Sequence, residues 1–333
     1  MFFMVKMLKS ALAVIVACGV LSFVLTFYSL MPVHKDNSDG NTDYIWEENS
    51  LWIKVTEGIA WGRFDANGYN NLKTVDSPDI LIAGSSHMEA TNVMQDESVT
   101  ALLSKSLIGK YSVYNVGISG HNFYKSSQYL PDNMRRYPSC KLIFVETSNV
   151  DLKRKDVEKA IEHTVTRTPS HDKGLIGFMQ RIPFFRILYQ QKEHGLLKRF
   201  MPGEESKKPS GKTSNVVDFV AYDKLFAYVK SLQEENNVQV VYFYHPTEKF
   251  LKDGRVCYER GQGLQAFVTY AEKYGVGFID LTKSFEEVYD IEHVVPHGFA
   301  TGKLGTGHLN SDGHRIAAKE ILKYIQQRET TVK

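Results

Sequence analysis

The sequence predicts an α/β fold in three layers (α/β/α) around a mostly parallel five-stranded sheet, with an N-terminal transmembrane helix and a mainly helical insertion. Short continuous apolar runs alternate with stretches of helical periodicity, a pattern typical of repeated βα units and a buried parallel sheet. A chain of 333 residues with 43% apolar content can bury one large core. Its net charge of +2 gives no reason to expect a nucleic acid as partner.

The N-terminal segment predicts a membrane anchor. Residues 11–31 carry no formal charge and are long enough to cross a bilayer as one helix. Lys6 and Lys9 precede this run and acidic residues dominate the segment after it, which keeps the N-terminus in the cytoplasm and places the rest of the chain outside. We expect residues 1–31 to be an uncleaved signal anchor.

Two alternatives for this segment stay open. A cleaved signal peptide needs small residues at its cleavage site, and the PVHKD after Met31 does not supply them convincingly. The sequence around Cys18 also resembles a lipoprotein processing site, but processing there would leave a mostly apolar stretch, 19–31, behind in the lipid. All three interpretations place the remainder of the chain outside the cytoplasm.

Residues 32–75 are expected to form a linker and lead-in, and residues 76–333 one α/β domain. The first part of the lead-in, 32–50, is polar and rich in turn-forming residues, so we interpret it as a linker. Apolar runs within the domain predict strands over 79–83, 111–118, 141–146, 238–244 and 276–281. Helices are expected from Asp96 onward and over 214–236, 264–275 and 312–327.

An insertion over about 151–213 interrupts this alternation. It holds 14 Lys and Arg against 8 Asp and Glu, which gives a net charge of +6. Its centre, 175–191, mixes aromatic and apolar residues with arginines. The plain interpretation is a cap domain with its own small core. The more specific one is a lid, or a face that lies near anionic lipid or glycan.

Polar groups suited to acyl transfer lie at 84–87, 117–122, 147–149 and 307–310. The first three segments come directly after strands, where ligands bind in such sheets. Ser86 offers a hydroxyl, which is a weak nucleophile unless a base removes its proton. His308 is suited to be that base, because imidazole titrates near neutrality. Each segment alone is more often a turn, a helix cap or a structural histidine. Their joint occurrence in this order predicts a site.

The same reaction places negative charge on the carbonyl oxygen of the substrate, and three donors are expected to converge on that oxygen. They are the backbone N–H of Ser86, the backbone N–H of Gly120 and the side-chain amide of Asn149. Glycine at 120 lets the backbone approach the substrate without a Cβ in the way. These residues form the predicted oxyanion hole.

The segments resemble the sequence blocks of the SGNH (GDSL-like) hydrolase and acyltransferase family, in the same order over most of residues 79–325. Gly84-Ser85-Ser86 matches the Gly-Asp-Ser block, with Ser86 as the nucleophile and Ser85 in the Asp position. Gly120 in NVGISG, Asn149 in ETSNV and His308 in GHLNSDGH match the later blocks. The resemblance implies a flavodoxin-like fold and a serine ester hydrolase or acyltransferase that needs no cofactor.

One position departs from the pattern of the family. Its catalytic Asp lies three residues before the histidine, where this chain has Gly305. Three interpretations stay open. A main-chain carbonyl of GKLGTG or the Thr306 hydroxyl orients His308; a distant acid such as Asp280 or Glu292 does so; or the chain is a degenerate, non-catalytic member of the family.

No metal is expected. His293, His297 and His308 lack the spacing of a zinc site. Three cysteines are too few and too scattered for a zinc site or a disulfide scaffold.

The sequence therefore predicts a single-pass membrane protein with a cytoplasmic N-terminus and an extracytoplasmic serine esterase or O-acyltransferase domain. Its expected substrates are acyl esters, in particular acetyl esters, of a cell-surface glycan. Anchored proteins of this kind resemble acyl-transfer components of bacterial polysaccharide modification, so the resemblance implies a membrane-bound O-acyltransferase as partner. Two alternatives are a glycan-binding or assembly protein without chemistry, which Gly305 supports, and a lipid esterase, which the apolar insertion suggests.

Overall fold

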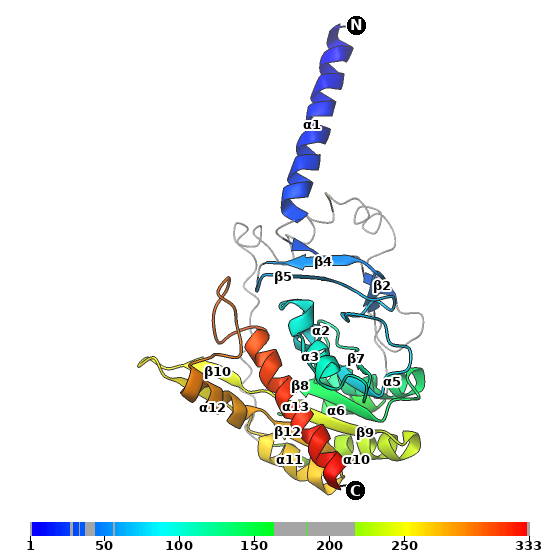
Figure 1. Cartoon of the computed structure of the whole chain (residues 1–333), viewed down its shortest axis with the longest axis vertical. Helices are drawn as coiled ribbons and strands as arrows, with labels where there is room; N and C mark the ends of the chain where they lie inside the picture. Colours follow the sequence, from blue (N-terminus) through cyan, green and yellow to red (C-terminus); the bar gives the residue numbers. More distant parts are fainter. Residues whose placement is uncertain are drawn as a thin grey trace.

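The computed structural model of the chain describes residues 2–26, 29–32, 34–36, 44–55, 57–162, 185 and 217–331 (Figure 1). The insertion expected over 151–213 is described only as far as residue 162 and at Phe185. The interpretation of its centre as a lid, a membrane face or a cap therefore lies outside the described residues.

A five-stranded parallel sheet forms the centre of the molecule. Its strands are β6 (Ile80–Ala83), β7 (Val113–Asn115), β8 (Leu142–Thr147), β9 (Gln239–Tyr244) and β12 (Gly277–Asp280), in the order β12-β9-β8-β6-β7. Every neighbouring pair runs parallel. All five predicted strands are thus confirmed. β6 and β8 are buried along their whole length, as expected of strands covered on both faces.

Helices cover both faces of the sheet, which confirms the three-layer fold. One face packs against α4 (Phe123–Gln128), α5 (Leu130–Arg136), α6 (Arg154–Ile161), α10 (Phe219–Asn236) and α11 (Leu264–Lys273). The other packs against α3 (Val99–Ser106), α12 (Thr282–Glu292) and α13 (Ser311–Thr331). Adjacent strand residues enter different cores, because side chains alternate across a sheet: Ile143 lies in the first core and Phe144 in the second.

The helix expected from Asp96 begins later. Asp96 lies in a single 3-10 turn, η1 (Gln95–Glu97), and α3 begins at Val99. The residue between them, Ser98, caps α3, since its hydroxyl accepts the N–H of Ala101 at 3.2 Å. A serine at this position satisfies an amide of the first turn that has no partner within the helix.

The lead-in contains more structure than a linker. β2 (His34–Asp36) pairs with β3 (Tyr44–Trp46), and β1 (Ser29–Leu30), β4 (Leu51–Lys54) and β5 (Ala60–Arg63) form a three-stranded antiparallel sheet. We call these three strands the lead-in sheet. Trp52 is fully buried in a small separate core with Trp46, Ala60 and Phe64. Trp46, which lies in the segment interpreted as a linker, packs into this core.

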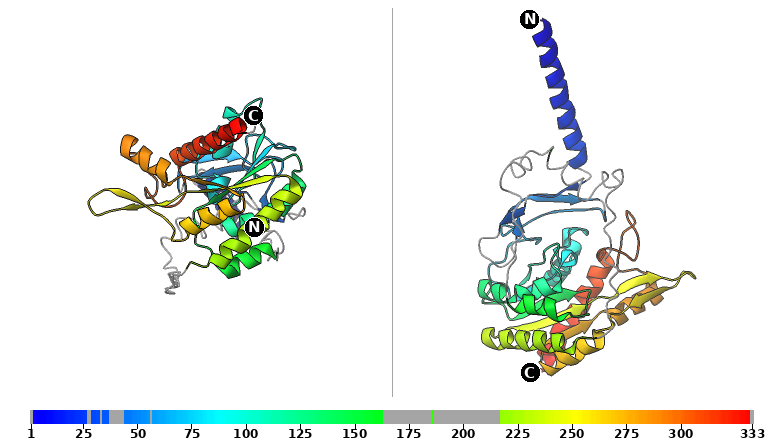
Figure 2. Two further views of the ribbon diagram at one scale, coloured as in Figure 1. Left: turned by 90° about the horizontal axis from the view of Figure 1, so that it is seen from below. Right: turned by 180° about the vertical axis from the view of Figure 1, so that it is seen from behind.

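The N-terminal helix α1 (Phe2–Thr26) stands away from the domain, and Figures 1 and 2 show the lead-in sheet between the two. Its Phe3–Val24 stretch is long and apolar enough to span a membrane and is almost entirely uncovered by the rest of the chain. A signal sequence near an N-terminus has the same length and composition.

Two elements near the carboxyl ends of the strands were not predicted. The short helix α2 (Ser86–Glu89) comes directly after β6. A hairpin of β10 (Thr247–Phe250) and β11 (Val256–Glu259) comes after β9 and projects from the domain (Figure 2).

Candidate active site

Ser86 is the first residue of α2, at the sharp turn after β6. Ser85 caps this helix, and its Oγ accepts the N–H of His87 at 3.3 Å. The turn fits tightly against β8, because a Cβ at Gly84 would lie 2.7 Å from the Cβ of Glu146. The backbone N–H and the hydroxyl of Ser85 both donate to Oε2 of Glu146, at 2.8 and 2.7 Å. The residue before Ser86 is therefore fixed by a buried carboxylate.

The structure brings Ser86 and His308 together. Oγ of Ser86 lies 2.8 Å from Nε2 of His308. His308 belongs to the histidine loop, by which we mean residues 297–309. This loop is closed by an isolated β-bridge between His297 and Leu309 and by the N–H of Gly298, which donates to the His308 carbonyl at 2.9 Å. The two ends of the loop thus hold each other beside the nucleophile.

The other nitrogen of His308 faces a carboxylate that the sequence did not reveal. Nδ1 of His308 lies 2.7 Å from Oε2 of Glu57, and the His308 backbone N–H donates to Oε1 of the same residue at 2.8 Å. Glu57 lies in the turn between β4 and β5 of the lead-in sheet. Glu57, His308 and Ser86 therefore form one continuous chain of hydrogen bonds, with the geometry of an acid, a base and a nucleophile.

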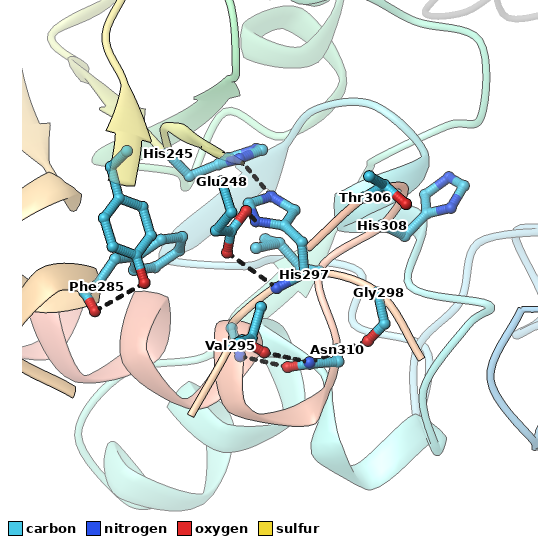
Figure 3. A network of polar contacts seen from close by, with 12 residues as sticks. His245, Glu248, Phe285, Val295, His297, Gly298, Thr306, His308 and Asn310 are labelled. Carbon is cyan, nitrogen blue, oxygen red and sulfur yellow. Dashed lines mark hydrogen bonds and ion pairs between the residues drawn. The ribbon is translucent and has the colours of Figure 1, made fainter. Parts of the chain in front are cut away.

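None of the groups proposed from the sequence orients the ring. The Thr306 hydroxyl donates to the carbonyl of Lys303 at 3.1 Å, although the side chain lies close to His308 in Figure 3. Oδ1 of Asp280 accepts the backbone N–H and the hydroxyl of Thr282, at 2.8 and 2.5 Å. Glu292 pairs with an arginine on α13. An acid distant in the sequence is present, as one interpretation required, but it is neither of the two that were named.

Three contacts position Glu57. Its carbonyl accepts the side-chain amide of Asn92 at 2.9 Å, and the N–H of Gly58 donates to the hydroxyl of Thr301 at 2.9 Å. Gly307 has a φ of +86°, and a Cβ there would lie 2.0 Å from Oε1 of Glu57. A glycine is therefore needed at 307 for the carboxylate to reach His308.

The ionisation of Glu57 is a consequence of these contacts. Burial by itself raises the pKa of this carboxyl, but the hydrogen bonds and positive charge of His308 outweigh burial and place the pKa below its ordinary value. Glu57 is therefore ionised at neutral pH and suited to hold the proton of His308 on Nδ1.

The predicted oxyanion donors flank the nucleophile in the sheet. Gly120 comes after β7 and Asn149 after β8, and β6 lies between these two strands. Gly120 has a φ of +81°, and a Cβ there would meet open space. The side chain of Asn149 is exposed, and its Oδ1 accepts the N–H of Asp151 at 2.9 Å. The structure thus places all three predicted donors at one end of the sheet.

The loop that carries Gly120 is held by Glu89, the last residue of α2. The backbone N–H of Ser119 donates to Oε1 of Glu89 at 3.1 Å, and the hydroxyl of Ser119 donates to Oε2. Trp46 from the lead-in donates to the same carboxylate at 2.7 Å. The nucleophile helix and the lead-in therefore both fix the position of this loop.

Three histidines lie close together in the α/β domain: His245 and His297 are buried and are labelled in Figure 3, and His87 is half-buried. Possible ligand nitrogens of His87, His245 and His297 lie within 4.8 Å of one another. Sequence reasoning grouped His297 only with His293 and His308, so it missed this cluster. His87 Nδ1 accepts the N–H of Leu309 at 3.1 Å. A neutral His87 therefore carries its proton on Nε2 and is not ready to bind a metal through that atom.

No protein-family model matches the chain, and no curated protein sequence matches it. Solved structures that it resembles include an acetyl xylan esterase, AlAXEase (TM-score 0.41, 13% identity, 74% of this chain and 99% of that chain). They also include the psychrotrophic esterase EstA from Pseudoalteromonas sp. (TM-score 0.38, 11% identity, 77% and 100%) and a catalytic mutant of an acetylxylan esterase from Geobacillus stearothermophilus (TM-score 0.38, 16% identity, 75% and 94%). At such identities the likeness concerns the fold alone.

Proposed function

We propose that this chain is an extracytoplasmic serine esterase or O-acyltransferase of the SGNH type. The observation that supports this most strongly is the continuous hydrogen-bonded chain from Glu57 through His308 to Ser86. Each residue type stands in the order that acyl transfer requires, at hydrogen-bond distance, although the three come from distant parts of the sequence.

In the proposed reaction, Oγ of Ser86 attacks the acyl carbonyl while Nε2 of His308 takes its proton. Glu57 keeps the remaining ring proton on Nδ1 and stabilises the imidazolium that forms. The backbone N–H groups of Ser86 and Gly120 and the amide of Asn149 stabilise the oxyanion. His308 then protonates the departing alcohol oxygen, which leaves an acyl group on Ser86. Water or a sugar hydroxyl then attacks this ester and gives its proton to His308. His308 returns the proton to Oγ of Ser86 as the acyl–Oγ bond breaks, and the carboxylic acid or the acylated sugar leaves.

The proposed substrates are acyl esters, in particular acetyl esters, of a glycan at the cell surface. This part of the proposal depends on α1, which would hold the domain outside the cytoplasm close to the bilayer. A membrane-bound O-acyltransferase is proposed as the partner that supplies the acyl group, because a glycan acyltransferase outside the cytoplasm needs a donor from the membrane.

A lipid esterase is the second candidate, and exposed apolar side chains near the site favour it. Ile59 lies two residues after Glu57 and is 63% exposed. Leu304, in the histidine loop, is 51% exposed, and Phe250, which packs on Gly305, is 47% exposed. Such side chains suit a long acyl chain better than an acetyl group. The non-catalytic alternative rested on Gly305, and Glu57 now supplies the carboxylate that this position lacks.

A fluorophosphonate probe tests the proposal on the full chain in detergent or nanodiscs. The probe should label Ser86, and Ser86→Ala should abolish both labelling and ester hydrolysis. Asn149→Ala should slow turnover by about 10²–10³-fold if its amide binds the oxyanion. Acetylated glycan compared with short and long acyl esters separates the two candidate functions. A folded wild-type protein that never labels would contradict both.

A further inference from the structure

The lead-in sheet has one face buried against the α/β domain and one exposed apolar face. Side chains alternate across a strand, so Trp52 and Ala60 point inward, where the domain residue Met94 packs on their core. Leu51 and Trp61 are their neighbours in the sequence and point outward, with exposed fractions of 54% and 56%. An antiparallel sheet with one buried face ordinarily places polar residues on the other face. The outward face of this sheet departs from that pattern.

The outward apolar residues form one row across the three strands. Leu30 of β1 pairs with Ile53 of β4, and Ile53 pairs with Trp61 of β5. Residues that lie directly opposite each other point to the same face of a sheet, so these three side chains lie side by side. Leu51 continues the row along β4, because it lies two residues before Ile53. We call Leu30, Leu51, Ile53 and Trp61 the outer patch.

The N-terminal helix places the outer patch next to the bilayer. The apolar stretch of α1 ends at Val24, and Leu30 follows six residues later, a distance of at most about 20 Å for an extended chain. Neighbouring strands lie about 5 Å apart, so the rest of the row is close to Leu30. Figures 1 and 2 show α1 rising from the side of the lead-in sheet that faces away from the domain. The outer patch therefore faces the membrane that α1 would cross.

The composition of the outward face suits the headgroup layer of a bilayer. Tryptophan is enriched at membrane–water interfaces, where its ring contacts acyl chains and its N–H stays hydrated. Arg63 pairs with Leu51 and is exposed, and one of its N–H groups donates to the carbonyl of Asn49 at 2.7 Å. A guanidinium has five N–H donors, so others can bind lipid phosphates. An apolar patch beside a cationic group is typical of a membrane contact.

We propose that the outer patch lies in the headgroup layer of the bilayer that α1 spans, and that lipid covers it. The lead-in sheet then holds the α/β domain at a fixed height and orientation on the membrane. Lipid is favoured over a protein partner because the short connection to α1 brings lipid to this face in every copy of the chain. This inference rests on the proposed function for the position of α1 in the membrane, but it requires no catalysis.

The contact with lipid would also support the catalytic acid. Glu57 lies in the turn between β4 and β5, the two strands that carry most of the outer patch. Ile59 in the same turn is 63% exposed and extends the apolar surface towards Glu57. Lipid that covers the outward face removes apolar surface from water and so opposes local opening of the sheet. The Glu57 side of the active site is then the side nearest the membrane.

Tryptophan fluorescence of the full chain in nanodiscs tests this contact. Of the three tryptophans, all of which the structure describes, Trp46 and Trp52 are buried and Trp61 alone is exposed. Lipids brominated near the headgroup end of their acyl chains quench an indole that touches them. The emission that is missing in Trp61→Phe should therefore be lost from the wild type in brominated discs. The emission that remains in Trp61→Phe should be nearly the same in brominated and ordinary discs.

Ile108 provides the matched controls. It is 84% exposed and precedes β7, so it lies at the amino ends of the parallel strands, away from Ser86. In the Trp61→Phe background, Ile108→Trp supplies an exposed tryptophan that brominated lipid should not quench. Leu51→Asp keeps Trp61 as the reporter and places a charge in the outer patch, so it should weaken the quenching. Ile108→Asp should leave the quenching of Trp61 unchanged.

Two results would each overturn the docking of the outer patch. If aqueous iodide quenches Trp61 in the discs and brominated lipid does not, the patch faces water. If neither quenches Trp61, protein covers the patch, either a second copy or another part of the chain.

Fluorophosphonate labelling of the same samples separates this inference from the proposed function. A chain that labels at Ser86 but shows no quenching by brominated lipid keeps the proposed chemistry and loses the docking. A chain that is quenched as expected but never labels supports the docking and contradicts the proposed chemistry. A chain that does not enter nanodiscs contradicts both the membrane position of α1 and the docking.

Discussion

The lead-in sheet and the α/β domain contribute to the same site in different ways. The α/β domain supplies Ser86 and His308 from the ends of elements that are packed against two large cores. The lead-in sheet supplies Glu57 from a turn beside a small core, in which four of the described residues are buried: Trp46, Trp52, Ala60 and Phe64. Ser86 and His308 are thus held by extensive packing, whereas Glu57 is held mainly by polar contacts with the domain.

This difference indicates which parts of the site resist local opening. Small cores with few apolar contacts open locally at lower free energy than large ones. Glu57 reaches His308 because Asn92 and Thr301, both in the α/β domain, hydrogen-bond to its turn. The lead-in therefore completes the site only while these contacts are made, and perturbations on that side should reduce activity without unfolding the domain.

Replacing the acid should have the largest effect on this side of the site. Glu57→Gln keeps the shape of the side chain but removes its charge. The new amide N–H donates to an unprotonated Nδ1 of His308, which favours the tautomer with its proton on Nε2, and that tautomer cannot take the proton of Ser86. The analogous change in a serine triad costs about 10⁴-fold, so we expect ester turnover to fall by about 10³–10⁴-fold. Steady-state hydrolysis and the fluorophosphonate labelling rate measure this loss.

A double variant tests whether the position of the acid matters as well as its charge. In the Glu57→Gln background, Gly305→Asp places a carboxyl group three residues before His308, yet it should not restore activity. A Cβ at 305 would lie 2.2 Å from the ring of Phe250, at a backbone φ of +73° that favours glycine. Recovery of turnover in the double variant would show that a carboxylate at 305 can orient His308 and that Glu57 is dispensable.

A smaller effect is expected from Gly307→Ala, which adds a methyl group to the α/β domain where it faces Glu57. The new methyl group would lie 2.0 Å from Oε1 of Glu57 and displace the carboxylate, so we expect turnover to fall by about 10- to 100-fold. Gly254→Ala is the matched control, because Gly254 has a φ of +85° and open space around its Cβ. Both variants carry a similar backbone strain of about 1–2 kcal/mol, so equal losses of turnover would argue against a specific contact with Glu57.

Much of the α/β domain could be predicted from the sequence because its signals are local. Each strand is a continuous apolar run, and Ser86, Gly120, Asn149 and His308 stand at fixed offsets from strands or helices. These residues follow one another along the chain in the same order as the strands and helices that carry them. Periodicity therefore sufficed to place all five strands, and the resemblance of the segments to known sequence blocks singled out Ser86 and His308.

Glu57 could not be found in the same way, because nothing local distinguishes it. It lies in a short turn between two antiparallel strands, 251 residues from its partner His308. Only the tertiary packing of the lead-in on the domain brings the two together. A weak signal lies in Gly305 and Gly307, because two glycines close to His308 leave room for a side chain from elsewhere in the chain.

The contact between Glu146 and His245, whose Oε1 and Nε2 lie 2.9 Å apart, was missed for a related reason. Glu146 is the penultimate residue of an apolar strand, and His245 comes directly after the next strand of the central sheet. Each could be interpreted alone as a structural polar residue, and the sequence contains no sign that parallel pairing of β8 and β9 places them side by side. Contacts across neighbouring strands depend on register, which a single sequence does not specify outside hairpins.

The smallest expected effect concerns the stability of the chain in acid. It depends on how the lead-in sheet, through Glu57, is held to the α/β domain. In the folded chain the contacts with His308 place the pKa of Glu57 below its ordinary value of 4.5. The unfolded chain therefore takes up the proton first as the pH falls. The contribution of Glu57 to stability is fully present above about pH 4.5 and is lost as the pH falls through the folded-state value.

Glu57→Gln lacks this contribution at every pH. The midpoint of thermal unfolding should therefore be higher for the wild type than for Glu57→Gln at pH 6–7, by at most about a few degrees. The two midpoints should converge as the pH is lowered from 5 towards 3. Glu146→Gln provides the contrast, because the contacts of that buried carboxylate lie wholly within the α/β domain and its pKa is about 2. Its difference from the wild type should persist to lower pH than that of Glu57→Gln. If the Glu57 difference instead stayed constant down to pH 3, the charge of Glu57 would not be what ties the lead-in to His308.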